Sequence, residues 1–172
     1  MNSNSIVVMG VSGSGKSLIG AQLADRLGQP FYDADDFHSP ANVRKMANGI
    51  PLSDADREGW LTDLAGLIER HDGLVLACSA LRRAYRDRLR RARPDLTFLY
   101  LDGDIDTIWE RLDRREDHYF NGRAMLESQF AQLEPPSDDE AIRIDIRQSA
   151  EQVLTQCLAA VYKGLNRTNP RR

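Results

Sequence analysis

Short apolar runs alternate with helix-like stretches along the whole chain. Five runs bounded by turn residues are expected to be strands: residues 5–9, 30–33, 74–79, 97–101 and 141–146. Because each run is followed by a segment with helical periodicity, the pattern predicts an α/β fold. In such a fold a mostly parallel sheet is covered by helices on both faces and joined by right-handed crossovers.

Capping residues place the helix ends. Ser39 and Pro40 are expected to open a short helix that stops before Gly49. Ser53 and Asp56 predict a carboxylate variant of the capping box at the start of the next helix. The apolar stripe of that helix should face a core, and it consists of Trp60, Leu64, Leu67 and Ile68. The remaining helices are expected from the Gly/Ser loop to Gly28 and over 81–92, 104–115, 124–133 and 149–163.

Length and charge narrow the function classes. A chain of 172 residues suits a single domain over 1–172, ending in a polar tail at 166–172. The net charge of −3 and a pI near 5.6 favour a small-molecule partner over nucleic acid or a membrane surface. The N-terminal run is too short for a signal peptide or a membrane span. Cys78 and Cys157 lie in apolar sequence, which favours reduced thiols and a cytoplasmic location.

The strongest chemical signal is "GVSGSGKS", residues 10–17, between a predicted strand and a predicted helix. It fits the phosphate-loop pattern in full, because glycines let backbone N–H groups face phosphate oxygens at a helix N-terminus. Lys16 adds a charge for the β and γ phosphates, and Ser17 offers a hydroxyl to Mg²⁺. The expected nucleotide-binding residues of the loop are Gly10, Val11, Ser12, Gly13, Ser14, Gly15, Lys16 and Ser17.

A cluster of acids, "DADDFH" at 33–38, follows the second predicted strand. Asp33 and Asp35 should lie at the carboxyl edge of the sheet and face the phosphate loop. On an extended segment the D-x-D spacing points both carboxylates to one side, where one can organise Mg²⁺ and the other can accept a hydroxyl proton. A self-solvating turn or a helix N-cap cluster is the alternative. A zinc site is disfavoured because His38 is the only nitrogen ligand nearby.

Beyond these residues, the chain resembles the gluconokinase family of small P-loop sugar-acid kinases. The similarity spans roughly residues 6–147 and rests on "MGVSGSGKS", "DADDFHSPANVRKMANGIPLSDADREGWL", "CSALRRAYRDRLR", "FLYLDGDIDTIWERLDRREDHYF" and "MLESQFAQLEPP". The resemblance implies ATP-dependent phosphorylation of D-gluconate at the 6-hydroxyl. It also implies a three-layer P-loop kinase fold with strand order 2-3-1-4-5, a helical substrate lobe near 36–72, a lid near 112–125, and a homodimer.

The residues and the resemblance together suggest roles on the acceptor side. Asp35 is the expected base, since it projects furthest past the strand, and Asp33 is expected to act through Mg²⁺ and its waters. His38 is a candidate for a substrate hydroxyl, although a lone histidine is often a capping or packing residue. The carboxylate of gluconate needs a cation, preferably a guanidinium, and Arg57 and Arg82 are the candidates.

In related P-loop kinases, arginines of the lid contact the nucleotide. By that resemblance Arg111 is assigned to adenine and Arg115 to the transferring phosphoryl group, where a guanidinium can stabilise developing charge. Arg114 is expected to be a surface charge. The third strand ends without an acid, so Mg²⁺ is expected to rely on Ser17, Asp33 and the nucleotide.

Two other motifs carry less weight. "DREG" at 56–59 matches the D-x-x-G of GTPases, but no N-K-x-D motif follows it. The arginine-rich segment 81–93 is interpreted as a solvated helix face, Arg82 excepted, and not as a nucleic-acid helix, because few aromatics interrupt it. Another small-molecule kinase of the shikimate or nucleotide type, or a non-catalytic ATP-binding regulator, remains the alternative function.

Overall fold

A five-stranded parallel sheet forms the centre of the molecule. The computed structural model describes residues 4–113 and 122–168. Its strands are β1 (Ile6–Met9), β2 (Phe31–Asp33), β3 (Val75–Ala77), β4 (Thr97–Asp102) and β5 (Ile142–Asp145). They lie in the order 2-3-1-4-5, and every neighbouring pair is parallel. The predicted sheet is therefore confirmed, with each strand within two residues of its expected bounds.

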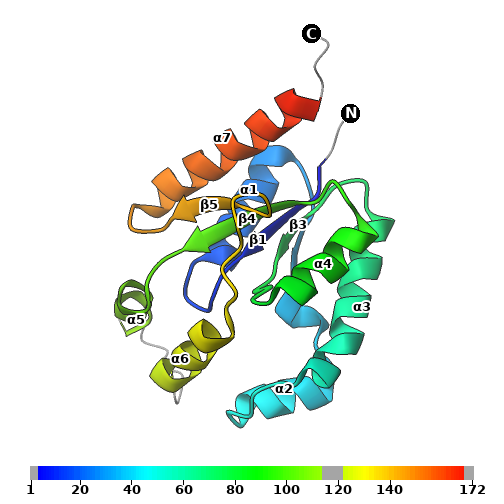
Figure 1. The fold of residues 1–172 in the computed structure, drawn as a ribbon. Helices are drawn as coiled ribbons and strands as arrows, with labels where there is room; N and C mark the ends of the chain where they lie inside the picture. The colour runs from blue at the N-terminus through cyan, green and yellow to red at the C-terminus, as the bar shows by residue number, and fades with distance from the viewer. Residues whose placement is uncertain (1–3, 114–121, 169–172) are drawn as a thin grey trace.

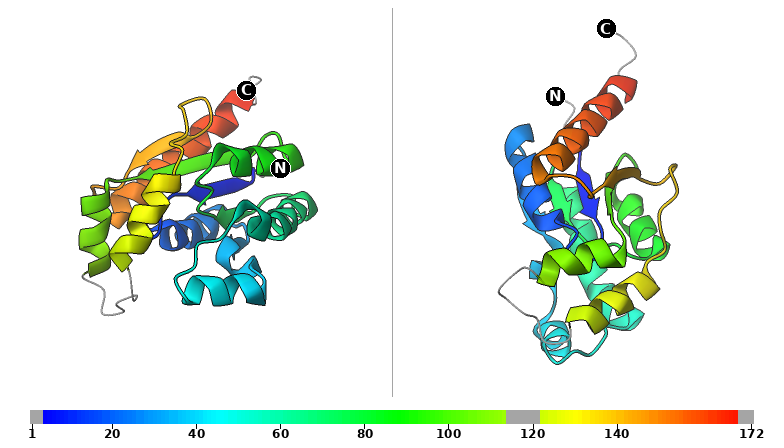
Figure 2. Two further views of the ribbon diagram at one scale, coloured as in Figure 1. Left: turned by 60° about the horizontal axis from the view of Figure 1, so that its bottom comes forward. Right: turned by 90° about the vertical axis from the view of Figure 1, so that its left-hand side faces the viewer.

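Helices cover both faces of this sheet. They are α1 (Lys16–Leu27), α2 (Pro40–Ala47), α3 (Asp54–Arg70), α4 (Arg83–Ala92), α5 (Ile105–Asp113), α6 (Gly122–Gln132) and α7 (Ala150–Thr168). Figures 1 and 2 show α1 and α7 on one face and α3 and α4 on the other, which gives three layers. The strand arrows point toward the end where α5 and α6 lie (Figure 1). No helix within 4–113 and 122–168 is long and apolar enough to cross a membrane.

The helix ends follow local side-chain chemistry. The Ser39 hydroxyl accepts the N–H of Asn42 at 3.1 Å. Ser53 and Asp56 form the predicted capping box. The Ser53 hydroxyl accepts from the Asp56 backbone nitrogen at 3.1 Å, and the Asp56 carboxylate accepts from the Ser53 backbone nitrogen at 2.9 Å. Gly28 ends α1 with φ of +65°, a conformation that costs little only without a side chain. These contacts confirm the predicted caps.

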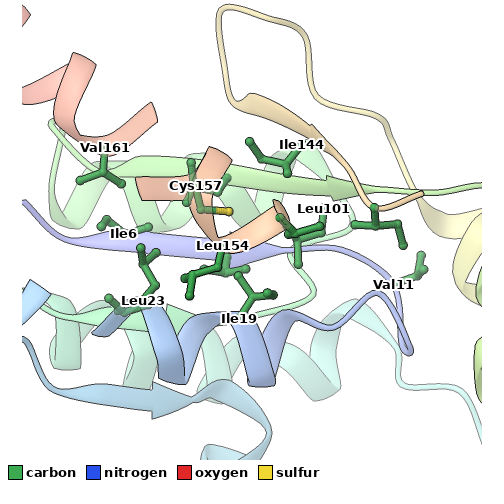
Figure 3. Close-up of a cluster of buried hydrophobic side chains, with 14 of the residues drawn as sticks. Ile6, Val11, Ile19, Leu23, Leu101, Ile144, Leu154, Cys157 and Val161 are labelled. Atoms are coloured by element: carbon green, nitrogen blue, oxygen red, sulfur yellow. The ribbon is translucent and has the colours of Figure 1, made fainter. Parts of the chain in front are cut away.

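Alternating residues of the strands divide the core into two clusters. Figure 3 shows the first, where Ile6 of β1 and Leu101 of β4 meet Leu23 of α1 and Leu154 of α7. The second cluster lies under α3 and α4 and contains the predicted stripe of Trp60, Leu64, Leu67 and Ile68, all buried. Because a strand presents successive residues to opposite faces, the short runs of the sequence supply both clusters.

The two cysteines confirm the predicted free thiols. Cys157 belongs to the cluster beneath α7, whereas Cys78 belongs to the cluster on the opposite face of the sheet. Both thiols are buried and unpaired. Burial raises the pKa of each to about 12, so both stay protonated near neutral pH. A disulfide between them would have to cross the sheet.

The prediction of a solvated face on the arginine-rich helix α4 is wrong for Arg86. Its side chain is 1% exposed and pairs with Glu140 at 3.1 Å. It also donates to the carbonyl oxygens of Ala80 and Glu134, each at 2.9 Å. A buried guanidinium is tolerated here because charged and neutral oxygens surround it. Arg86 thereby ties α4 to the connection between α6 and β5.

Candidate active site

The phosphate loop leaves the carboxyl end of β1 and turns directly into α1. Gly13 and Gly15 have φ of +79° and +93°, where a side chain is disfavoured. A Cβ on Gly13 would also lie 2.7 Å from Cγ of Leu112. The N-terminus of α1 has no side-chain cap and no acid in its first turn, so its positive end is open to an anion. In the part of the chain that the structure describes, no acceptor pairs with the N–H of Gly13 or Gly15.

Ser17 and Asp33 join the phosphate loop to the end of β2. The Ser17 hydroxyl donates to Oδ2 of Asp33 at 2.7 Å. The register explains the contact, because Asp33 and Val8 both align with Ala77 of β3 and thus lie at the same level of the sheet. A hydroxyl and a carboxylate are oxygen donors of the kind that Mg²⁺ prefers, so the pair fits the predicted magnesium site.

The local geometry of the acid cluster differs from the prediction. Residues 34–37 form a 3-10 helix, so Asp33 and Asp35 are not two residues of one extended segment. Asp33 caps this helix, and its Oδ1 accepts the N–H of Asp35 at 3.0 Å. The reason is that an aspartate at a strand end can bond the backbone two residues on, which closes a turn. The N-cap alternative thus describes the backbone, while Asp35 still lies just past β2.

The charges of Asp33, Asp35 and Lys16 all act on the thiol of Cys78. Burial is the main cause that raises the pKa of its thiol, and the charges of Asp35 and Asp33 raise it further while Lys16 lowers it. The three charged groups therefore lie close enough to the end of β3 to act on one buried atom. Within 4–113 and 122–168, no group of three or more His, Cys, Asp or Glu side chains is placed to hold a metal ion. A Mg²⁺ at Ser17 and Asp33 would need oxygens from nucleotide and water as well.

His38 packs against Trp60 at the edge of the acid cluster. Their rings are stacked with centroids 4.4 Å apart. The Trp60 indole N–H donates to the carbonyl oxygen of Ala34 at 2.7 Å, which fixes the ring beneath the 3-10 helix. Burial lowers the pKa of His38, although the nearby Asp35 charge raises it. The imidazole is thus held neutral and in a fixed orientation beside Asp35.

Arg57 lies in a polar cluster formed by α3, α4 and α6. Its guanidinium donates to the hydroxyl of Tyr85 at 3.0 Å and to the amide oxygen of Gln132 at 3.2 Å. Tyr85 in turn donates to the Asp54 carboxylate at 2.5 Å. No carboxylate in the described residues forms an ion pair with Arg57. The guanidinium is oriented by neutral oxygens and keeps its charge available.

The other predicted arginines are more scattered. Arg82 is exposed at the residue before α4. Arg111, on α5, donates to the carbonyl oxygens of Ile146 and Gln148 in the loop between β5 and α7. Arg115, predicted to contact the transferring group, lies outside the described residues, as does Arg114. The part of the predicted lid from 114 to 121 lies outside them too.

Sequence reasoning missed two glutamines on α6. Gln129 accepts the N–H of Ser12 at 2.7 Å and donates to the Ser12 hydroxyl at 3.1 Å. Gln132, three residues later, contacts Arg57 as described above. Both lie in the segment "MLESQFAQLEPP", and their spacing places them on one helix face. That spacing was the available signal, but nothing local reveals the partners.

Comparisons with known proteins agree with this geometry. A family model described as shikimate kinase matches residues 12–162. The thermosensitive gluconokinase of Escherichia coli strain K12 is 46% identical over 167 residues, covering 94% of this chain and 89% of that protein. The probable gluconokinase of Mus musculus is 44% identical over 181 residues, covering 93% of this chain and 96% of that protein.

A solved structure extends the likeness to the coordinates. The crystal structure of a gluconokinase from Sinorhizobium meliloti 1021 superposes with a TM-score of 0.88 at 39% identity, covering 97% of this chain and 94% of that one. A shikimate kinase from Aquifex aeolicus shares the fold, with a TM-score of 0.57 at 19% identity. By the matched model and by these relatives, the chain belongs to the gluconokinase family, within the shikimate kinase group of P-loop kinases.

Proposed function

We propose that the protein phosphorylates D-gluconate at its 6-hydroxyl with ATP, giving 6-phospho-D-gluconate and ADP. The observation that carries the proposal is the contact between Ser17 and Asp33, because it brings a phosphate loop and an acidic strand end to one place. Phosphoryl transfer to an alcohol needs both groups together. The similar proteins are named gluconokinases, and this is the reason to propose gluconate as the acceptor.

On the donor side, the loop and Lys16 hold the triphosphate. Within residues 4–113 and 122–168 no acceptor pairs with the N–H groups of Gly13 and Gly15, so these groups and the N-terminus of α1 are proposed to bind the phosphates. The Lys16 ammonium is proposed to neutralise charge on the β and γ groups. Ser17 and Asp33 would hold Mg²⁺, which supplies charge neutralisation between the β and γ phosphates when bound. Arg111 is proposed to stack on adenine, since it already lies at the loop between β5 and α7.

On the acceptor side, Asp35 is the proposed base. The oxygen of the 6-hydroxyl attacks the γ-phosphorus, the bond from that phosphorus to the β–γ bridging oxygen breaks, and ADP leaves. The hydroxyl proton passes to the Asp35 carboxylate as the new P–O bond forms. Cys78 is an unsuitable base in this position, because burial raises its pKa to about 12.

Three side chains are proposed to recognise the sugar acid. Arg57 binds the carboxylate, because its guanidinium is oriented by Tyr85 and Gln132 and offers the planar donors that a carboxylate accepts. Arg82 is the second candidate, since it is exposed near the end of β3. His38 offers a neutral imidazole for a hydroxyl, in an orientation fixed by Trp60. Arg57 and His38 both lie in the helical substrate lobe near residues 36–72, which is part of this proposal. The roles of Arg115 and of the lid near 112–125 stay predictions.

The cellular setting belongs to the same proposal. The unpaired thiols of Cys78 and Cys157 support a reducing compartment, so a cytoplasmic location is proposed. A homodimer is proposed from the family resemblance alone. Sedimentation of the purified protein at several concentrations tests the assembly, and a sedimentation coefficient of a 19.4 kDa monomer at every concentration would contradict it.

An acceptor panel tests the proposed reaction. Purified protein is supplied with MgATP and, separately, with D-gluconate, other aldonates, shikimate or nucleoside monophosphates, and ADP release is followed by a coupled assay. Gluconate should stimulate ADP release far more than the others, and the product should be oxidised by 6-phosphogluconate dehydrogenase. ADP release with shikimate or a nucleotide and not with gluconate would favour the alternative kinase. Nucleotide binding without turnover of any acceptor would favour a regulator.

A further inference from the structure

The amide of Gln129 makes a two-point contact with the phosphate loop. Its Oε1 lies 2.7 Å from the backbone nitrogen of Ser12, and its Nε2 lies 3.1 Å from the Ser12 hydroxyl. The two hydrogen bonds run in opposite directions, so each residue both donates and accepts. The neighbouring Gly13 is in the left-handed region at φ of +79° and packs against Leu112. The first turn of the loop is thus fixed by side chains from α5 and α6.

One turn further along α6, Gln132 contacts the acceptor side. Its Oε1 accepts from Arg57 at 3.2 Å, while its Nε2 donates to the Ser128 hydroxyl at 3.3 Å, which orients the amide. Residues three apart on a helix are neighbours on its surface. Figure 1 shows α6 between α5 on one side and α2 and α3 on the other, an arrangement also visible in Figure 2. A single helix face therefore contacts both the phosphate loop and the candidate carboxylate-binding arginine.

The spacing of donor and acceptor matters for this chemistry. In-line transfer needs the attacking oxygen roughly 3–3.5 Å from the phosphorus, and a displacement of about 1 Å can cost a hundredfold in rate. Ser12 follows β1 and Arg57 lies on α3, so the two belong to separate parts of the chain. The amides of α6 give these parts a common rigid support.

We propose that Gln129 is a positioning residue for phosphoryl transfer, which holds α6 against the phosphate loop so that Gln132 keeps Arg57 at a fixed distance from the nucleotide. The inference rests on the proposed function for its acceptor, and it adds roles for Gln129 and Gln132. Neither amide is required to touch the reacting atoms. Their effect is to set the distance between the two substrates.

Isosteric substitutions test the two contacts separately. Gln129→Met removes both hydrogen bonds to Ser12 with little change of volume, and Gln132→Met removes the contact with Arg57. Gln22→Met is the matched control, because Gln22 is exposed on α1 away from both contacts. Two quantities are measured for each full-length variant: steady-state kinetics with ATP and gluconate, and amide hydrogen exchange over residues 6–17 without nucleotide.

The expected results differ between the variants. Gln129→Met should lower kcat about ten- to a hundredfold while the KM for ATP changes less than about threefold, because misplacement affects the reacting geometry more than nucleotide binding. The Ser12 amide should exchange about tenfold faster, since its acceptor is lost. Gln132→Met should instead raise the KM for gluconate about tenfold, and Gln22→Met should match the wild type in every measurement.

Several results would overturn the inference. A kcat of Gln129→Met within twofold of wild type would remove Gln129 from its role, and so would unchanged exchange at Ser12. If Gln129→Met fails to fold, Gln129→Ala removes the same two hydrogen bonds, and an unchanged kcat there has the same meaning. Failure of the proposed function shows differently: the wild type itself would release no ADP with gluconate, while the exchange experiment would still decide whether Gln129 holds the loop.

Discussion

Asp33 accepts a hydrogen bond from the Ser17 hydroxyl, with the two oxygens 2.7 Å apart, although the two residues come from different elements of the fold. The contact exists because Asp33, at the end of β2, lies level with Val8 of the parallel sheet, and the phosphate loop begins two residues later. The other carboxylate oxygen of Asp33 accepts the backbone N–H of Asp35 at 3.0 Å. Asp33 thereby fixes the position of the proposed base as well as that of the proposed metal ligand.

Loss of the Asp33 charge should change the response to magnesium. Asp33→Asn is expected to raise the Mg²⁺ concentration for half-maximal activity about tenfold or more, because it removes the carboxylate proposed to order the metal and its waters. Initial rates over a Mg²⁺ titration at fixed ATP measure the effect. Asp36→Asn, one helical position beyond Asp35 and exposed, is the control. Identical titration curves for Asp33→Asn and wild type would contradict the metal assignment.

Removal of the proposed base should separate binding from chemistry. Asp35→Asn is expected to lower kcat about 10²- to 10⁴-fold, since general base catalysis contributes on that order. Its Kd for a non-hydrolysable ATP analogue, measured by calorimetry, should stay within about threefold of wild type, because nucleotide binding is proposed to rely on the loop. Turnover like that of Asp36→Asn would show that another group takes the proton.

Lys16 should contribute to both binding and turnover. Lys16→Ala is expected to raise the KM for ATP and to lower kcat, each by about tenfold or more, because the ammonium is proposed to contact phosphates whose charge is redistributed during transfer. Lys163→Ala, exposed on α7, is the control for loss of a lysine. Kinetics of Lys16→Ala that match this control would be incompatible with a phosphate site in the loop.

The guanidinium shape of Arg57 should matter for the acceptor. Arg57→Lys keeps the charge but loses the planar donors, so the KM for gluconate is expected to rise about tenfold or more while the KM for ATP is unchanged. Tyr85→Phe removes one oxygen that orients the guanidinium and should give a smaller rise. Arg83→Lys, exposed on α4, serves as the control. An unchanged KM for gluconate in Arg57→Lys would move the carboxylate site to Arg82.

The buried pair of Arg86 and Glu140 predicts a loss of stability in acid. Burial alone would raise the pKa of Glu140, but hydrogen bonds from Arg86 and Arg90 lower it from 4.5 to about 2. Since the folded pKa lies below the unfolded one, the stabilisation is present above pH 4.5 and is lost as the pH falls toward 2.

A substitution isolates that contribution. Glu140→Gln leaves Arg86 buried without its charge partner and should cost about 3–5 kcal/mol of unfolding free energy near neutral pH, measured by urea denaturation. The variant should also lose less stability than wild type between pH 5 and pH 3. Glu127→Gln, whose partner Arg123 is half-exposed, should change stability by less than about 1 kcal/mol. Equal stability of the two variants would mean that the buried pair contributes nothing.

The sequence predicted the features that depend on residues close together in the chain. The strands and helix caps follow from alternation and from side chains such as Ser39 and Ser53, which bond backbone groups three residues away. The phosphate loop is itself a local motif. Even the meeting of Ser17 and Asp33 followed from topology, because parallel strands end at one edge of the sheet.

The remaining features depend on partners that are distant in the chain. Burial of Arg86 is tolerated because it forms an ion pair with Glu140, 54 positions later in the chain. Gln129 reaches Ser12 across 117 positions. Nothing in the neighbouring residues marks either side chain as special. The prediction of an extended D-x-D segment was wrong for the opposite reason. The Asp33 side chain accepts the backbone N–H of Asp35, and this short-range hydrogen bond favours a turn over the extended conformation.

Trp60 gives the molecule an intrinsic optical signal beside His38, the proposed ligand of an acceptor hydroxyl. Its indole is 5% exposed, yet its face is covered by the imidazole of His38. The second of the two tryptophans, Trp109, lies on α5 near Arg123. With Trp109→Phe as background, a sugar acid that displaces or protonates the stacked ring should alter fluorescence quenching of Trp60. With His38 in its proposed role, acceptor occupancy can therefore be followed in the unlabelled protein, in real time and without turnover.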